Sequence, residues 1–176
     1  NYTNFEEQSL LVDVSLHIGS FLAVLCYFYK DILDFVKNKI LFLKILISSI
    51  PVMLIGFFLV ETNLIENLRN IKVIAWTTLI FGILLYFSDK RNLGKNIESN
   101  FSFKSAIFIG AFQILSLIPG VSRSGITMTA ARILNFNRFD SAKISFLLSL
   151  PTLGAVSLFG LNNTLSSNNI NFSLIN

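Results

Sequence analysis

The chain has few charged residues and a single cysteine, and both scarcities limit what it can be. Charged side chains make up 14% of its 176 residues, whereas 53% of the residues are hydrophobic and 18 are Phe. Soluble domains carry roughly a quarter charged residues, so this chain lacks the polar surface that a water-soluble domain of its size needs. Cys26 has no second cysteine with which to form an intrachain disulfide. The composition fits a protein whose solvent is the lipid bilayer.

The few charges fall in clusters between long charge-free windows. The net charge of +4 forms no basic stripe, which argues against nucleic acid as a partner. A charge at the centre of a membrane helix costs about 2.5–3.5 kcal/mol, so the charge-free windows predict membrane spans. The predicted spans are residues 14–29, 45–60, 73–88 and 144–160, the last with an expected kink at Pro151. The sequence therefore predicts an all-α polytopic membrane protein, in which residues 1–176 form part of a single transmembrane domain.

Residues 105–136 differ from these spans because a polar break divides two short apolar halves. The break contains Pro119, Gly120 and Arg123, and neither half is long enough to cross a bilayer alone. The pattern predicts a re-entrant helix–loop–helix hairpin. Basic residues follow the first and third spans, which places those connections in the cytoplasm by the positive-inside rule. A hairpin that enters and returns on one side keeps Arg138 and Lys143 in the cytoplasm too.

The polar break and the helix that restarts after it bring together groups that bind phosphate. A helix N-terminus presents backbone N–H groups and a positive dipole end, and an arginine fork matches two phosphate oxygens. The hydroxyls could donate hydrogen bonds or act as a nucleophile, and the glycines allow close backbone approach. Alternatively, the small residues only permit tight helix packing and the arginine extends to the membrane interface. The candidate residues are Gln113, Gly120, Ser122, Arg123, Ser124, Gly125 and Thr127.

Two other phosphate-binding motifs are excluded, and the membrane histidine has no clear role. Gly120 and Gly125 have the glycine spacing of a Walker A loop, but Ile126 stands where that loop needs a lysine. The acid-phosphatase type of lipid phosphatase needs a histidine at the position of Thr129. His17 lies four residues after Asp13 in the first predicted span, so the two could pair on one helix face. A structural role is favoured for His17, whereas structure and function remain equal alternatives for Asp13.

The run GAFQILSLIPGVSRSGITMTAARILNFNRFDSAKISFLLSLPTLGA resembles a signature region of the undecaprenyl-diphosphatase family, bacterial membrane phosphatases associated with bacitracin resistance. The segments EEQSLLVDVSLHIGSFLAVLCYFYKDI and SSIPVMLIGFFL are similar to the same family in order and spacing. The resemblance implies a multi-pass enzyme of the bacterial cytoplasmic membrane that hydrolyses undecaprenyl diphosphate to undecaprenyl phosphate and inorganic phosphate. This reaction recycles the lipid carrier for cell-wall synthesis. It implies that Arg123 clamps the diphosphate, that Ser122 and Ser124 bind or attack it, and that Thr127 assists.

The same resemblance implies inverted repeats with two re-entrant hairpins, a homodimer and a divalent cation, Mg2+ or Ca2+. The family's other signature region, with paired glutamates and a histidine, would precede Asn1, and neither Glu6 nor Glu7 belongs to it. The cation's ligands are therefore expected upstream, with no metal ligand in these residues. We expect a piece that lacks both ends of the protein and is inactive alone. The rival function is a transporter or carrier for an anionic lipid or small anion, because broken membrane helices also hold anionic substrates in transporters.

Overall fold

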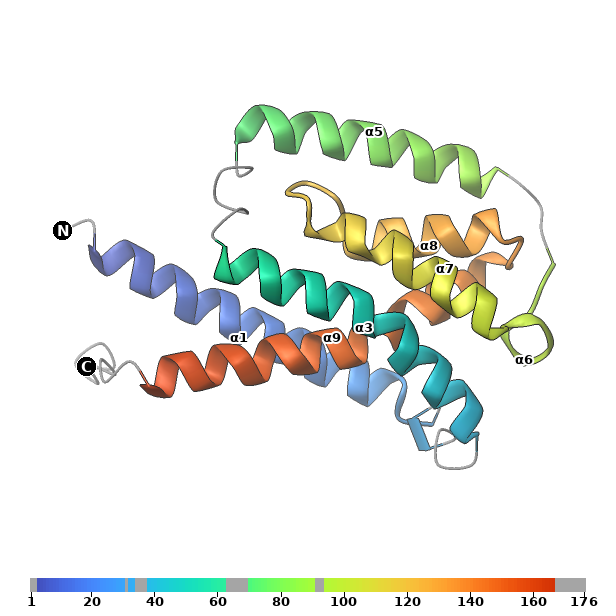
Figure 1. Cartoon of the computed structure of the whole chain (residues 1–176), viewed down its shortest axis with the longest axis horizontal. Helices are drawn as coiled ribbons and strands as arrows, with labels where there is room; N and C mark the ends of the chain where they lie inside the picture. The colour runs from blue at the N-terminus through green and yellow to red at the C-terminus, as the bar shows by residue number, and fades with distance from the viewer. Residues whose placement is uncertain (1–2, 31, 34–37, 63–69, 91–93, 167–176) are drawn as a thin grey trace. The chain divides into compact units, whose positions relative to one another are not determined.

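The computed structural model describes residues 3–30, 32–33, 38–62, 70–90 and 94–166, and the side chains of 3–14, 60–61, 159 and 161–166 are outside this description. Within the described residues the regular elements are helices, and the one β-bridge is isolated (Figure 1). The prediction of an all-α fold is confirmed. The helices are α1 (Thr3–Tyr27), α3 (Lys39–Glu61), α5 (Ile71–Asp89), α6 (Ile97–Asn100), α7 (Phe103–Ile114), the 3-10 turn η1 (Leu115–Leu117), α8 (Arg123–Ile133) and α9 (Arg138–Ser166).

Among the described residues, three helical stretches are long and apolar enough to cross a bilayer. They are Lys39–Leu59 in α3, Ile71–Asp89 in α5 and Arg138–Leu158 in α9, which coincide with three of the predicted spans. The first predicted span falls in α1, where Ser15–Tyr27 is described as a shorter apolar helix. Both α3 and α9 continue through an internal proline, as membrane helices can when neighbouring groups satisfy the backbone. The polytopic membrane architecture is confirmed.

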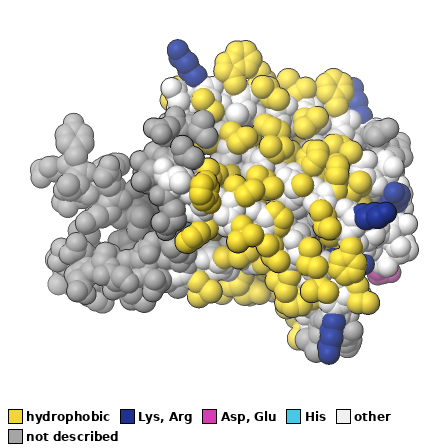
Figure 2. All heavy atoms as spheres, in the orientation of Figure 1, with side chains coloured by type: hydrophobic (Ala, Val, Ile, Leu, Met, Phe, Trp, Pro, Cys, Tyr) yellow, Lys and Arg dark blue, Asp and Glu magenta, His cyan; other side chains and the backbone are white. Residues whose placement is uncertain are grey.

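The surfaces of α3 and α5 are apolar where a soluble protein would be polar. Leu54 and Trp76 are each 65% exposed, and Phe58 is 62% exposed. Figure 2 shows hydrophobic side chains over much of the visible face, with several Lys and Arg side chains near its margins. This distribution suits contact with lipid acyl chains, with the basic side chains at headgroup level.

The chain forms two compact parts, which are described separately. One part comprises Asn1–Tyr29 and Leu150–Asn176, where the Phe21 ring lies beside Gly154 and thus joins α1 to the C-terminal portion of α9. The other part comprises Lys30–Ser149 and contains α3, α5 to α8 and the beginning of α9. All the predicted site residues belong to this second part.

In the second part, α7, η1 and α8 form a helix–loop–helix hairpin that packs against α3 on one side and α5 on the other (Figure 1). At 1.5 Å per residue, α7 and α8 are about 18 Å and about 17 Å long, against a hydrocarbon core of about 30 Å. The two ends of the hairpin are joined, because Lys95 N–H donates to Asn135 O at 3.1 Å and Asn137 N–H donates to Lys95 O at 3.0 Å. The chain thus enters and leaves the hairpin at the same end. Its re-entry into a membrane stays a prediction.

Small residues bring α7 unusually close to α3. A Cβ at Gly110 would collide with the backbone carbonyl of Ser48 and lie 3.0 Å from Ser48 Cα. Ala106 and Ile109 on α7 and Ser49 on α3 are fully buried at this contact. Close backbone approach through small residues is the usual way in which membrane helices gain packing contacts. The contact fixes one face of the hairpin and leaves its other face to α5.

Candidate functional site

The turn at the tip of the hairpin has the geometry that its Pro-Gly pair favours. The tip is defined here as residues 118–125. Val121 N–H donates to Ile118 O at 3.1 Å, and Gly120 has a φ of +91°. A type II turn places proline at its second position and needs a positive φ at its third, where glycine pays no steric penalty. Pro119 and Gly120 therefore form a tight turn between the end of η1 and the start of α8.

Helix α5 holds this turn through two adjacent hydroxyls. Thr77 Oγ1 donates to Pro119 O at 2.7 Å, and Thr78 Oγ1 donates to Gly120 O at 2.9 Å. A Cβ at Gly120 would collide with the Thr77 hydroxyl and would lie 2.6 Å from Ile74 O. Glycine is thus required here twice, once for its backbone angle and once for the close approach of α5.

The start of α8 is capped by a predicted site residue. Ser122 has extended backbone angles, and its Oγ accepts a hydrogen bond from Gly125 N–H at 3.2 Å. Such a cap begins a helix whose first N–H groups and positive dipole end face the preceding turn. Ser124 Oγ lies 3.3 Å from Ser122 Oγ, and Arg123 sits between them in the chain, half-buried. Two hydroxyls therefore meet at a helix N-terminus, and the residue between them in the chain is Arg123.

Thr127 lies one turn further along α8 and faces inward. Its side chain is 1% exposed, and its Oγ1 lies 2.7 Å from Ser145 Oγ on α9. Its hydroxyl also lies 2.9 Å from Arg123 O, and Ser145 Oγ donates to Ser124 O at 3.3 Å. These bonds tie the first turn of α8 to α9. Thr127 thus supports the residues that form the tip, and a direct part in chemistry stays a prediction.

Gln113 is the most unusual polar side chain of the hairpin. It is 0% exposed on α7, and neither its Oε1 nor its Nε2 has a hydrogen-bond partner among the described residues. Ser48 Oγ on α3 is buried in the same unsatisfied state. An unsatisfied buried polar group costs about 1–3 kcal/mol of stability. Such a group is therefore expected mainly where a further group, such as a water molecule or a ligand, supplies its hydrogen bonds. The predicted binding role of Gln113 fits an amide that still has its donor and acceptor capacity.

Three hydroxyl residues of the site were not singled out in the sequence: Thr77, Thr78 and Ser145. The threonines stand together in an otherwise apolar span, which is the only signal that the sequence offers for them. His17 belongs to the other compact part, where its side chain is exposed. The side chains of Glu6, Glu7 and Asp13 lie outside the described set, so the proposed pairing of Asp13 with His17 is untested. The remaining predicted residues lie together on the hairpin.

The described side chains do not form a divalent-cation site. Among them, no three His, Cys, Asp or Glu residues come close enough together to hold a metal ion. The groups at the tip are hydroxyls, a guanidinium and backbone N–H groups, which are donors to anions and poor ligands for Mg2+ or Ca2+. The residues present therefore do not fit a cation at the tip, and they fit an anion well.

Comparison with known families decides where this hairpin belongs. A family model described as "Bacitracin resistance protein BacA" matches residues 1–175. The chain belongs to the BacA family. Proteins named undecaprenyl-diphosphatase are similar to it: that of Pelagibacter ubique is 52% identical over 162 residues, covering 92% of this chain and 63% of the relative. That of a Jannaschia species is 39% identical over 173 residues, covering 90% of this chain and 64% of the relative.

A third relative in the BacA family, the undecaprenyl-diphosphatase of Hahella chejuensis, is 40% identical over 168 residues, which cover 88% of this chain and 62% of the relative. The chain thus spans under two thirds of the length of these relatives. The family that the sequence motif indicated is confirmed. The tip described above is a BacA-family segment that combines an arginine, two hydroxyls and a helix start, an arrangement suited to holding the oxygens of a phosphate.

Proposed function

We propose that this chain is part of an enzyme that hydrolyses undecaprenyl diphosphate to undecaprenyl phosphate and inorganic phosphate, and that the hairpin tip binds the diphosphate. The relatives that carry this name support the reaction. The observation that carries the assignment to the tip is the capped start of α8, where Arg123 lies between two serines beside a turn fixed by α5.

The depth of the tip supports a site inside the membrane. The tip contacts α5 at Thr77, six residues from the first residue of that helix and twelve from the last. At 1.5 Å per residue, the tip lies about 9 Å from one end of α5 and about 18 Å from the other. A re-entrant hairpin whose two ends meet at one side of the bilayer would place its tip at this depth. Polar backbone is stable there only when it is buried in protein or lines a wet cavity.

In the proposed reaction the tip stabilises negative charge on the transferred phosphoryl group. The fork of Arg123 and the N–H groups at the start of α8 donate to the phosphoryl oxygens as the P–O bond of the anhydride breaks. The leaving undecaprenyl phosphate takes the electrons of that bond. Either water attacks the phosphorus directly, or the hydroxyl of Ser122 or Ser124 attacks first and water then hydrolyses the phosphoserine. Both routes release inorganic phosphate, and the proton of the attacking oxygen passes to a phosphate oxygen. Ser122 already caps α8, so its oxygen lies at the N-terminus where the charge develops.

Three further expectations remain part of this proposal. A divalent cation, Mg2+ or Ca2+, would have to be held by residues outside those that the structure describes, so no step is assigned to it here. A second copy of the protein would make the enzyme a homodimer. The protein would work in the bacterial cytoplasmic membrane, recycling the lipid carrier for cell-wall synthesis. The 176-residue chain alone would be inactive.

The decisive experiment measures phosphate release from a polyprenyl diphosphate by the purified full-length protein. An Arg123→Lys variant keeps the charge but loses the fork, and we expect kcat to fall by about 100-fold. Unchanged turnover would refute the role of the fork. Transport of the lipid without phosphate release would replace the hydrolase with the rival carrier function.

Two serine variants identify the attacking oxygen. Ser122→Ala or Ser124→Ala should abolish turnover if that oxygen attacks, and should lower it by about 10- to 100-fold if it only donates a hydrogen bond. Ser99→Ala is the matched control, because Ser99 is an exposed hydroxyl on α6 away from the tip. Equal activity of the three variants would remove both serines from the site.

A further inference from the structure

A cavity lies at the opposite end of α8 from the tip. It has a volume of about 400 Å3 and opens to the surroundings among α5, α8 and the start of α9. Arg132 lies nine positions after Arg123 in α8, which is about 14 Å along the helix. A headgroup bound beside Arg132 therefore lies apart from the tip. We call it the α5–α8–α9 groove; its principal lining residues are Gly82, Tyr86, Asp89, Met128, Arg132 and Arg138.

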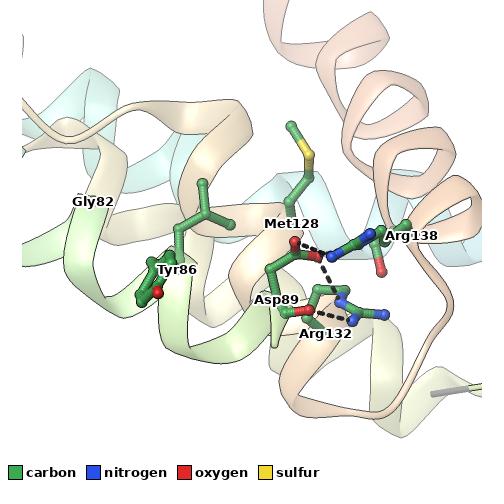
Figure 3. A pocket seen from close by; sticks show the side chains of 8 residues that line it. Gly82, Tyr86, Asp89, Met128, Arg132 and Arg138 are labelled. Carbon is green, nitrogen blue, oxygen red and sulfur yellow. Dashed lines mark hydrogen bonds and ion pairs between the residues drawn. The ribbon is translucent and has the colours of Figure 1, made fainter. Parts of the chain in front are cut away.

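Two arginines and one aspartate form a charged cluster in the lining of the groove (Figure 3). Arg138 Nε donates to Asp89 Oδ1 at 2.9 Å, and its Nη2 lies 2.8 Å from Asp89 Oδ2. Arg132 is 3% exposed; its Nη2 donates to Asp89 O at 2.9 Å, and its Nη1 donates to Phe136 O at 2.8 Å. Its Nε lies 3.3 Å from Asp89 Oδ1. The carboxylate balances only one of the two guanidinium charges, so the cluster keeps a net charge of +1.

The positive charge is accessible from the groove. The side chain of Arg138 is 72% exposed although it pairs with Asp89, whereas Arg132 is held in place by carbonyl groups. An arginine has five N–H donors, and the two contacts of Arg138 with Asp89 use only part of its fork. A charged fork at the rim of a cavity is suited to an oxyanion with one negative charge, such as a phosphodiester.

The rest of the groove lining is largely apolar, and further apolar side chains are exposed on α5. Leu79, Ile83 and Phe87 on that helix are 53%, 48% and 62% exposed. Tyr86, at the groove, is 58% exposed, and Lys90 Nζ lies 4.6 Å from the centre of its ring. Aromatic rings and lysines mark the membrane–water interface, whereas exposed aliphatic side chains one or two turns away mark the acyl region. A lipid has this order of chemistry, with a charged headgroup beside apolar chains.

We infer that the α5–α8–α9 groove binds the phosphodiester headgroup of an anionic phospholipid, whose acyl chains lie along α5. The net charge of the Asp89–Arg132–Arg138 cluster selects a headgroup with one net negative charge over a zwitterionic one. The bound lipid also covers the seam where α5, the end of the hairpin and the start of α9 meet. The groove is thus a lipid site separate from the proposed catalytic tip, and it does not depend on that proposal.

The test is lipid binding to the full-length protein, measured by native mass spectrometry in detergent with added dioleoyl phosphatidylglycerol or dioleoyl phosphatidylcholine. We expect phosphatidylglycerol to bind about tenfold more tightly than phosphatidylcholine, since both carry a phosphodiester anion but the positive cluster repels the choline cation of phosphatidylcholine. Arg138→Gln should remove this preference. Gly82→Leu should also remove it by filling the groove, because a Cβ at Gly82 meets nothing within 4 Å and the ion cluster remains intact.

Lys104→Gln is the matched control, because Lys104 is an exposed cation at the start of α7 that does not line the groove. It should keep the tenfold preference. A preference that survives both groove variants, or that Lys104→Gln also removes, would refute the site. Displacement of phosphatidylglycerol by millimolar inorganic phosphate would show a free-anion site instead. Tighter binding of a polyprenyl monophosphate at the same residues would assign the groove to that lipid and overturn the phospholipid.

Discussion

Replacement of Gly120 by alanine tests whether the tip must be held by α5. Gly120 has a φ of +91°, a conformation that costs an L-residue with a side chain roughly 1–2 kcal/mol. The new Cβ would also collide with the Thr77 hydroxyl and lie 2.6 Å from Ile74 O, so the turn must move away from α5. That movement breaks the hydrogen bonds from Thr77 and Thr78, each worth about 1 kcal/mol. The total loss of stability is about 3–4 kcal/mol.

The functional effect should be larger than the loss of stability alone suggests. A displacement of about 1 Å in a catalytic group lowers turnover by about 100-fold. We expect Gly120→Ala in the full-length protein to lower phosphate release from a polyprenyl diphosphate by that factor, together with a lower melting temperature in detergent. Gly94→Ala is the control, because Gly94 is exposed and a Cβ there meets nothing within 4 Å. If Gly120→Ala released phosphate within threefold of the control and melted at the same temperature, the contact with α5 would be unimportant.

Two further substitutions test the supports around the site. Ser145→Ala removes the hydroxyl that lies 2.7 Å from Thr127 Oγ1. We expect thermal melts to show about 1–2 kcal/mol lower stability, and we expect a smaller loss of activity than for a tip variant. An activity loss as large as that of Arg123→Lys would contradict a supporting role. Gly110→Ala forces a Cβ against the Ser48 backbone, so we expect about 1–3 kcal/mol lower stability from the overpacked contact of α7 with α3. A melting temperature equal to that of the unsubstituted protein would show that α3 can move.

Much of the hairpin could be predicted because the lengths of its two apolar halves can be read from the sequence. Two apolar halves too short to cross a bilayer, divided by Pro119 and Gly120, leave few arrangements other than a hairpin with a tight turn. These features depend on neighbours within a few residues, which is why local chemistry was enough to find them.

The supports of the tip could not be predicted because they depend on register between helices. Thr77 and Thr78 form hydrogen bonds with residues 42 positions further along the chain. Nothing in the sequence of their own span determines which residues of the hairpin lie opposite them. Thr127 was grouped with the tip by sequence distance, but one helical turn directs it toward α9. The orphan amide of Gln113 likewise depends on how closely α7 packs to its neighbours, which hydrophobicity patterns do not specify.

Helix α5 contacts the hairpin at two separated points, and this has a mechanical consequence. Its threonines hold the turn, and Asp89 at its far end pairs with Arg132 in the last turn of α8 and with Arg138 at the start of α9. A shift of the hairpin along α5 by one helical turn would break both sets of contacts at once. The hairpin and α5 therefore behave as one stiff unit that resists a piston-like stroke. Under the proposed function, a lipid diphosphate would approach the tip between helices while the turn itself stays in place.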